Sequence, residues 1–98
     1  MTSQLLKEIE IKANTLPIVP NNYLSTKHSG EYGPSPELLR WPYVRVKSES
    51  RSGEEIYLIF RFQYFWLIWD STEERYTKCE TTSCLHDFFK YKDLFIVL

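Results

Sequence analysis

The sequence of 98 residues lacks most of the signatures that mark enzymes, polyanion-binding proteins and disulfide-rich domains. Its three glycines form no phosphate-binding loop, because neither G-x-G-x-x-G nor G-K-[ST] occurs. Two cysteines are too few for a disulfide framework. A basic excess is also missing, since 12 Lys and Arg residues are balanced by 13 Asp and Glu residues. That balance argues against a general polyanion binder, although it allows a local basic patch.

Targeting and membrane-spanning segments are missing as well. The N-terminal residues 1–14 alternate charged and apolar side chains, and they have no apolar core of the kind found in a signal peptide. The longest apolar stretch, 56–69, is shorter than the about 20 residues of a membrane-spanning helix, and Arg61 and Gln63 interrupt it. We therefore expect a cytoplasmic protein without membrane contact.

Cys79, Cys84 and His86 form the C-x4-C-x-H pattern, which is the best candidate for a metal site in this sequence. A structural zinc site needs four nitrogen or sulfur ligands, and the fourth would have to be the distant His28. Cys84 is also expected on the apolar side of a helix. We therefore predict no metal site and two buried or half-buried thiols, with a Cys79–Cys84 disulfide as the alternative.

A catalytic site is not predicted either. His86 directly precedes Asp87, and adjacent residues of a helix point about 100° apart, so the two cannot form a relay to a nucleophile. The pairs Glu54–Glu55 and Glu73–Glu74 lie at predicted hairpin ends, where we interpret them as solubilising charges. The sequence predicts neither an enzyme nor a cofactor.

Hydrophobic periodicity predicts a single α+β domain. Apolar spacing indicates a helix within 1–14, and 15–42 contains all five prolines and is expected to be irregular, except for a helical turn or two over 36–40. From Tyr43 onward, 43–98 should form an antiparallel β-meander, a C-terminal helix and a last strand. The last strand is parallel to its neighbour if the helix makes a right-handed crossover, and antiparallel otherwise. The predicted elements are strands at 43–48, 56–69, 75–80 and 94–98 and a helix at 83–91.

The apolar stretch 56–69 is too long for one straight strand. Fully extended it would reach about 45 Å, whereas a domain of this length has a radius of gyration of about 13 Å. It must coil, kink or contain a hidden tight turn. We favour a bend near 61–63, with one half pairing to 43–48 and the other to 75–80.

Side-chain alternation in 56–69 assigns its even positions to the core and its odd positions to a partly open face. A bulge near 61–63 would exchange the two faces beyond it. The last strand, being apolar throughout, is expected to be covered on both faces. The predicted core is Leu5, Ile9, Val44, Val46, Ile56, Leu58, Phe60, Phe62, Trp66, Leu85, Phe88, Phe89 and Ile96.

The open face is the candidate binding site. Alternation places Tyr43, Arg45 and Lys47 on one face of their strand, and the odd positions of 56–69 could extend that face. Arg, Tyr and Trp are enriched at binding hot spots. The predicted partner-binding residues are Tyr43, Arg45, Lys47, Tyr57, Arg61, Phe65 and Trp69.

These observations favour a small non-enzymatic protein-binding module of the inhibitor, antitoxin, immunity or accessory type. The alternative is a module for single-stranded nucleic acid, because aromatic side chains stack on bases while cations follow the phosphates. A solvated sheet face with no partner is the simplest explanation of the same pattern. Binding through 15–42 and homodimerisation through an exposed strand edge near Phe65 and Trp69 also stay open.

Overall fold

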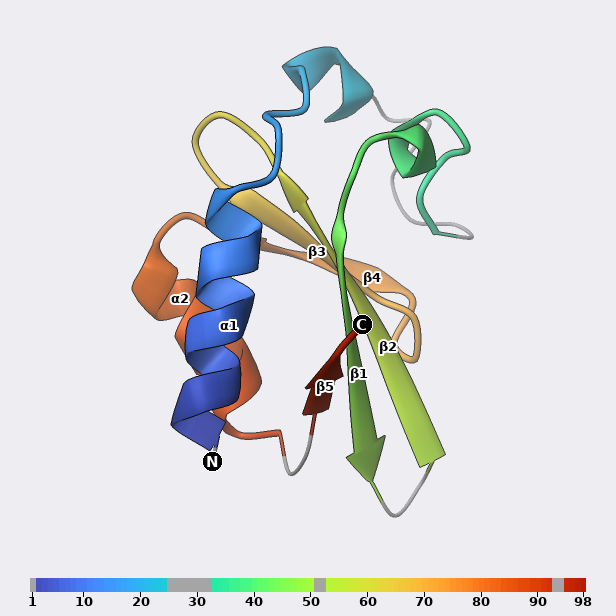
Figure 1. Cartoon of the computed structure of the whole chain (residues 1–98). Coiled ribbons are helices and arrows are strands. Elements are labelled where there is room, and N and C mark those ends of the chain that lie inside the picture. Colours follow the sequence, from blue (N-terminus) through green and yellow to red (C-terminus); the bar gives the residue numbers. More distant parts are fainter. Residues whose placement is uncertain (1, 25–32, 51–52, 93–94) are drawn as a thin grey trace.

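The computed structural model describes residues 2–24, 33–50, 53–92 and 95–98, and it confirms the α+β fold (Figure 1). The predicted N-terminal helix, irregular segment, C-terminal helix and last strand are all found. In chain order the elements are α1 (Thr2–Asn14), the 3-10 helices η1 (Asn21–Leu24) and η3 (Leu38–Arg40), strands β1 (Val44–Ser50), β2 (Gly53–Arg61), β3 (Trp66–Asp70) and β4 (Arg75–Cys79), helix α2 (Thr82–Lys90) and strand β5 (Phe95–Val97).

Short polar side chains fix the starts of the helical segments after residue 33. Ser35 Oγ accepts a hydrogen bond of 3.1 Å from the backbone N–H of Leu38, at the start of η3 within the predicted 36–40 turn. The N-cap of α2 is Thr81, one residue before the predicted Thr82 or Ser83. Its hydroxyl accepts from the backbone N–H of Cys84 at 3.0 Å.

The long apolar stretch forms a hairpin, so the favoured single bent strand was wrong. Strands β2 and β3 pair antiparallel, with Ile59 opposite Ile68, and the N–H of Phe62 donates to the carbonyl of Phe65 at 2.9 Å to close the turn. Gln63 lies exposed at the tip. The pairing of the two halves was predicted correctly, since β2 also pairs with β1 and β3 with β4. The meander therefore has one strand more than predicted.

The last strand joins the opposite edge of the sheet from β4. The strand order is β4-β3-β2-β1-β5, and β5 runs antiparallel to β1 with Val97 opposite Val46. The alternative of an antiparallel last strand was thus correct, but β5 pairs with β1 and not with β4. Both β1 and β4 offered an edge with unpaired backbone groups, and the strand pattern alone does not distinguish two such edges.

Two hydrophobic clusters lie on opposite faces of the sheet. Helices α1 and α2 cover one face, while the irregular segment between α1 and β1 covers part of the other (Figure 1). The helix-side cluster contains Ile9, Ala13, Leu16, Val44, Val46, Tyr57, Ile59, Ile68, Cys79, Leu85 and Phe89. The second cluster contains Val19, Leu38, Phe60, Phe62 and Leu67.

This two-sided burial corrects the assignment of faces. In β2 the odd positions Tyr57 and Ile59 face the helices, and Phe60 is buried as predicted but in the second cluster. A strand covered on both faces is apolar on both, so its alternation does not tell which face meets the helices. Ile96 was also placed wrongly, because β5 is an edge strand and this side chain is 45% exposed.

Candidate binding face

Three predicted site residues do share an open face. Tyr43 precedes β1, and Arg45 and Lys47 alternate with the buried Val44 and Val46, so their side chains leave the sheet on the side opposite the helices. Tyr43 is 37% exposed and packs against Phe60, with ring centroids 5.3 Å apart. The strand β1 therefore presents an aromatic and two cations in a row, as the alternation predicted.

Tyr57 and Trp69 are not available to a partner, which corrects their assignment. Tyr57 is 0% exposed, because it faces the helices and meets Phe88 and Phe89 edge-to-face at 5.5 and 5.6 Å. Its burial, and after it the nearby carboxylates, raises the pKa of its hydroxyl. Trp69 is 6% exposed and lies against Tyr76 at 4.8 Å.

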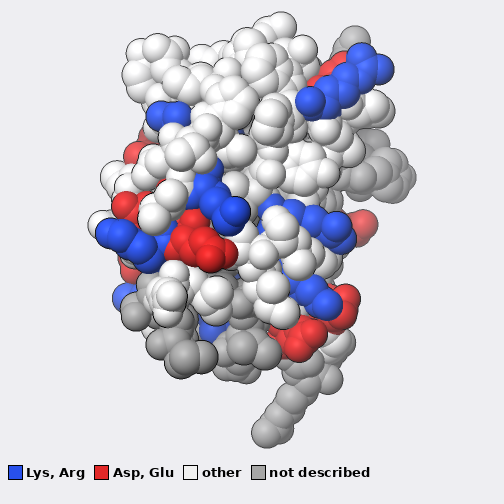
Figure 2. Space-filling model, viewed as in Figure 1, with Lys and Arg blue, Asp and Glu red and all other residues white. Residues whose placement is uncertain are grey.

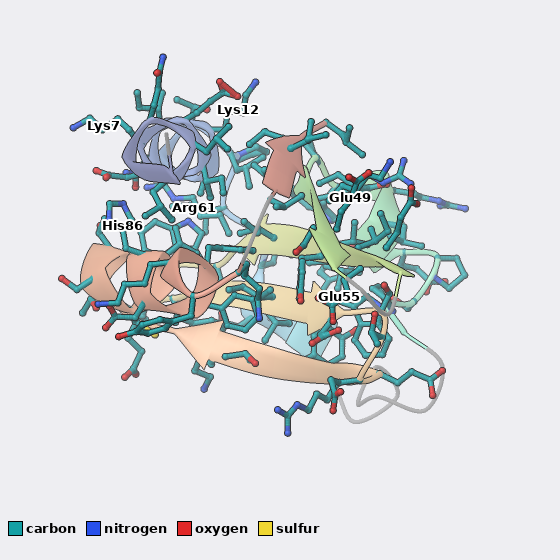
Figure 3. All side chains as sticks on the ribbon, turned by 90° about the horizontal axis from the view of Figure 1, so that it is seen from below. Lys7, Lys12, Glu49, Glu55, Arg61 and His86 are labelled. Atoms are coloured by element: carbon teal, nitrogen blue, oxygen red, sulfur yellow. The ribbon has the colours of Figure 1, made fainter. Side chains whose placement is uncertain are left out.

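Arg61 also has a structural position rather than a binding one. Its guanidinium donates hydrogen bonds of 2.8 and 3.0 Å to the carbonyls of Asn14 and Leu16 at the C-terminal end of α1. Trp66 Nε1 donates to the neighbouring carbonyl of Ala13 at 3.1 Å. Helix ends leave carbonyls without intrahelical donors, and a cation is favoured there by the helix dipole. Arg61 thus attaches α1 to the sheet, and it points between the two helices (Figure 3).

Phe65 belongs to the β2–β3 turn and lies apart from the row on β1. It is half-buried and stacks on Phe62 with centroids 5.2 Å apart, and Lys78 Nζ lies 4.6 Å from its ring centre. Of the seven predicted binding residues, Tyr43, Arg45 and Lys47 therefore form one exposed row, and the other four do not join it. Tyr57 and Arg61 lie on the helix side, Phe65 lies in the turn, and Trp69 shares the face of Arg45 but is buried two strands away.

Apolar side chains of β2 and β5 take the place of those four beside the cations. The register pairs Lys47 with Ile56 on one side and with Ile96 on the other. It likewise pairs Arg45 with Leu58, while the N–H of Leu98 donates to the Arg45 carbonyl at 2.8 Å and continues the register with β5. Directly opposite residues share a face. We call this surface the β1–β2–β5 face: Tyr43, Arg45, Lys47, Ile56, Leu58, Ile96 and Leu98.

The sequence analysis missed the β5 part of this face. Ile96 is 45% and Leu98 57% exposed. Ile11 and Ile18 are similarly exposed elsewhere, but these two side chains lie together on one face beside Arg45 and Lys47. An apolar run can form either a central or an edge strand, so the sequence of 94–98 did not reveal that this strand would be exposed on one face. The β2 part was missed because the even positions Ile56 and Leu58 had been assigned to the core. Both are half-buried.

The charges on this face are arranged unevenly. Lys47 Nζ lies 2.7 Å from Glu54 and 3.7 Å from Glu49, and the hydrogen bond to Glu54 is the main reason that the pKa of Lys47 is raised. Arg45 forms no ion pair within the described part of the chain. Figure 2 accordingly shows both signs of charge over the strands rather than a continuous basic surface. Of the two cations on this face, Arg45 is therefore the one without an ion pair among the described residues.

Other candidate chemistry is dispersed. His86 Nε2 lies 2.9 Å from Glu10 Oε1 and links α2 to α1, while Asp87 pairs with Lys90 at 3.2 Å on the helix surface. His28, the fourth candidate ligand, lies outside the described residues. Among the residues that are described, no group of three or more His, Cys, Asp or Glu side chains could hold a metal ion. Within C-x4-C-x-H, Cys79 and Cys84 contact each other, whereas His86 is engaged by Glu10.

Comparison of the chain with protein-family models, with curated proteins and with solved structures gave no match. Within the described ranges, no helix has both the length and the apolar composition needed to cross a membrane.

Proposed function

We propose that this chain is a small non-enzymatic protein-binding module, of the inhibitor, antitoxin, immunity or accessory type, which acts by occupying a protein partner. The observation that carries the proposal is the β1–β2–β5 face, where Arg45 has no ion pair among the described residues. The exposed Ile96 and Leu98 lie on one side of it, and the half-buried Ile56 and Leu58 lie on the other. Scattered apolar residues on a surface need no partner, but Ile96 and Leu98 adjoin Arg45 and Lys47 across one strand boundary.

The partner that fits this face is a folded protein with an apolar contact and a carboxylate beside it. Tyr43, Ile96 and Leu98 supply apolar contact area, and Arg45 offers a planar guanidinium that can bind a carboxylate with two hydrogen bonds. Tyr and Arg are the residue types that contribute most at hot spots. The Lys47–Glu54 pair would remain at the rim, where an exposed ion pair contributes little.

Single-stranded nucleic acid fits the same face less well. A phosphate backbone requires several free cations in a groove, together with aromatic rings on which bases can stack. Here Lys47 is paired with acidic groups, and Tyr43 is tilted against Phe60 rather than lying free. Glu49 and Glu54 would repel phosphates at the same end of the face.

Site-specific photo-crosslinking tests the proposal. The residue p-benzoylphenylalanine is introduced at Ile96, and at Lys7 on the outer side of α1 as a matched position away from the face (Figure 3). In a nuclease-treated lysate of the source cells, the Ile96 position should give a discrete protein adduct that the Lys7 position does not give. Adding Arg45→Glu should remove that adduct.

Each other outcome contradicts the proposal in its own way. Equal labelling from both positions, or no adduct from Ile96, would remove the β1–β2–β5 face as the binding site. An adduct that appears only when nuclease treatment is omitted would favour the nucleic-acid alternative, and an adduct between two copies of the chain would indicate a homodimer.

A further inference from the structure

The thiols of Cys79 and Cys84 meet where β4 ends and α2 begins. Their Sγ atoms lie 2.8 Å apart, which is about 0.8 Å longer than a disulfide bond of about 2.05 Å. Both cysteines are free. The binding face uses neither residue, and β4 lies at the sheet edge opposite β5.

The approach of the two sulfurs follows from the local structure. Cys79 is the last residue of β4 and is 0% exposed within the helix-side cluster. Thr81 then ends the extended backbone, and its hydroxyl accepts the hydrogen bond from the N–H of Cys84 at 3.0 Å. This N-cap folds the first turn of α2 back over the end of β4. The two thiols are therefore held together by folded backbone rather than by chance rotamers.

The two thiols differ in access to solvent. Cys84 is half-buried and packs at the rim of the cluster, so it is the more accessible of the two cysteines. Cys79 is enclosed, and burial, followed by the hydrogen bond to Cys84, raises the pKa of its thiol to about 12. Reactive thiols are accessible and readily form the thiolate, whereas buried thiols are inert until a neighbour engages them.

We propose that Cys79 and Cys84 form a reversible intramolecular disulfide, with Cys84 as the entry point and a low-molecular-weight disulfide such as oxidised glutathione as the oxidant. The Cys84 thiolate attacks one sulfur of oxidised glutathione, forming a mixed disulfide and releasing one glutathione thiolate. The Cys79 thiol gives up its proton and attacks the Cys84 sulfur, which releases the second glutathione. Two protein thiols are oxidised, and one glutathione disulfide is reduced to two glutathione molecules, which take up the two protons.

The experiment equilibrates the folded full-length chain in glutathione buffers of graded reduced-to-oxidised ratio. Free thiols are then alkylated at each ratio, and the intact mass is measured. The native chain should pass from a doubly alkylated form to an unalkylated form lighter by two hydrogen atoms, with little mixed disulfide between them. The melting temperature should rise on oxidation by on the order of 10 °C, since a short closed loop is constrained.

Single variants test the assigned roles. Cys79→Ser should accumulate glutathione at Cys84, because nothing resolves the mixed disulfide. Cys84→Ser should stay unmodified under the same conditions, because Cys79 is enclosed. If a serine variant is unfolded by circular dichroism, the corresponding alanine variant replaces it.

A further test compares disulfide formation in the folded chain with disulfide formation in the same chain unfolded by urea. In urea the two cysteines keep their sequence spacing but lose the N-cap, so disulfide formation should require a buffer at least tenfold more oxidising than for the folded chain. Two free thiols at every ratio, a stable mixed disulfide in the native chain, or equal behaviour of folded and unfolded chains would each overturn the proposal.

Discussion

Replacing Arg61 by alanine should destabilise the protein far more than an ordinary surface substitution. The guanidinium donates to the carbonyls of Asn14 at 2.8 Å and Leu16 at 3.0 Å, and a hydrogen bond from a charged donor contributes about 1.5–3 kcal/mol when shielded from water. The hydrogen bond to Asn14 is exposed to water, so we assign it a smaller contribution to the free energy of unfolding. A cation at a helix C-terminus adds about 0.3–1 kcal/mol. We expect a loss of about 2–3 kcal/mol in the free energy of unfolding.

The loss is measured by urea unfolding followed by circular dichroism, and in a domain of this size it lowers the melting temperature by roughly 10–20 °C. Arg61→Lys keeps the charge but not the forked donor geometry, so it should recover only part of the loss. Arg75→Ala on the edge strand β4 is the matched control and should stay within about 0.5 kcal/mol of the native protein.

A double-mutant cycle adds a second test of the same attachment. Trp66→Phe removes the 3.1 Å hydrogen bond to the carbonyl of Ala13, and both changes loosen the same end of α1, so their effects should not be additive. If Arg61→Ala cost no more than Arg75→Ala, the argument that Arg61 holds α1 on the sheet would be refuted, and Arg61 would return as a binding residue.

Four further results are expected. Phe60→Ala should cost about 3–5 kcal/mol in urea unfolding, because the side chain is fully buried in the second cluster, and a cost under about 1 kcal/mol would contradict that packing. Tyr76→Phe should leave stability at neutral pH unchanged or raised, because the hydroxyl is buried without a hydrogen-bond partner among the described residues, and a loss above about 1 kcal/mol would reveal a missed partner. Burial raises the pKa of Tyr76 to about 12, so the folded state keeps its proton longer than the unfolded state, and the native protein should lose stability as the pH rises from about 10 to 12, with a smaller loss in Tyr76→Phe. Treatment with a strong chelator should leave the melting temperature unchanged, and a drop would revive a metal site at Cys79, Cys84 and His86.

The sequence predicts the elements of this fold better than it predicts their faces. Helix and strand positions follow from local spacing and turn residues, and the pairing of each half of 56–69 was right. The hidden turn escaped prediction because Gln63 and Tyr64 are not typical turn residues. Which face of β2 meets the helices depends on where the irregular segment packs. That segment places Val19 and Leu38 in one cluster with Phe60, a long-range packing that periodicity does not encode.

The sequence predicted correctly only the part of the candidate site that depends on side-chain alternation within a single strand. Tyr43, Arg45 and Lys47 share a face because alternation within β1 guarantees it. Their neighbours depend on register and on the edge that β5 selects, so residues from the wrong face of β2 were placed beside them. Arg61 illustrates a different difficulty: an arginine in an apolar stretch is typical both of a hot spot and of a helix-end anchor. Only the position of the C-terminal end of α1 separates these two roles.

The most direct test of the central claim is the affinity of the captured partner for the double variant Arg45→Glu, Ile96→Lys, measured by isothermal titration. Both side chains are exposed on the β1–β2–β5 face, so the melting temperature should stay close to that of the native protein. The variant replaces the unpaired cation with an acid and an apolar contact with a charge. We expect the dissociation constant to rise at least 100-fold, equivalent to about 2.7 kcal/mol, whereas the control Lys7→Glu should bind as tightly as the native chain. Native affinity in the folded double variant would show that the partner binds elsewhere on the molecule.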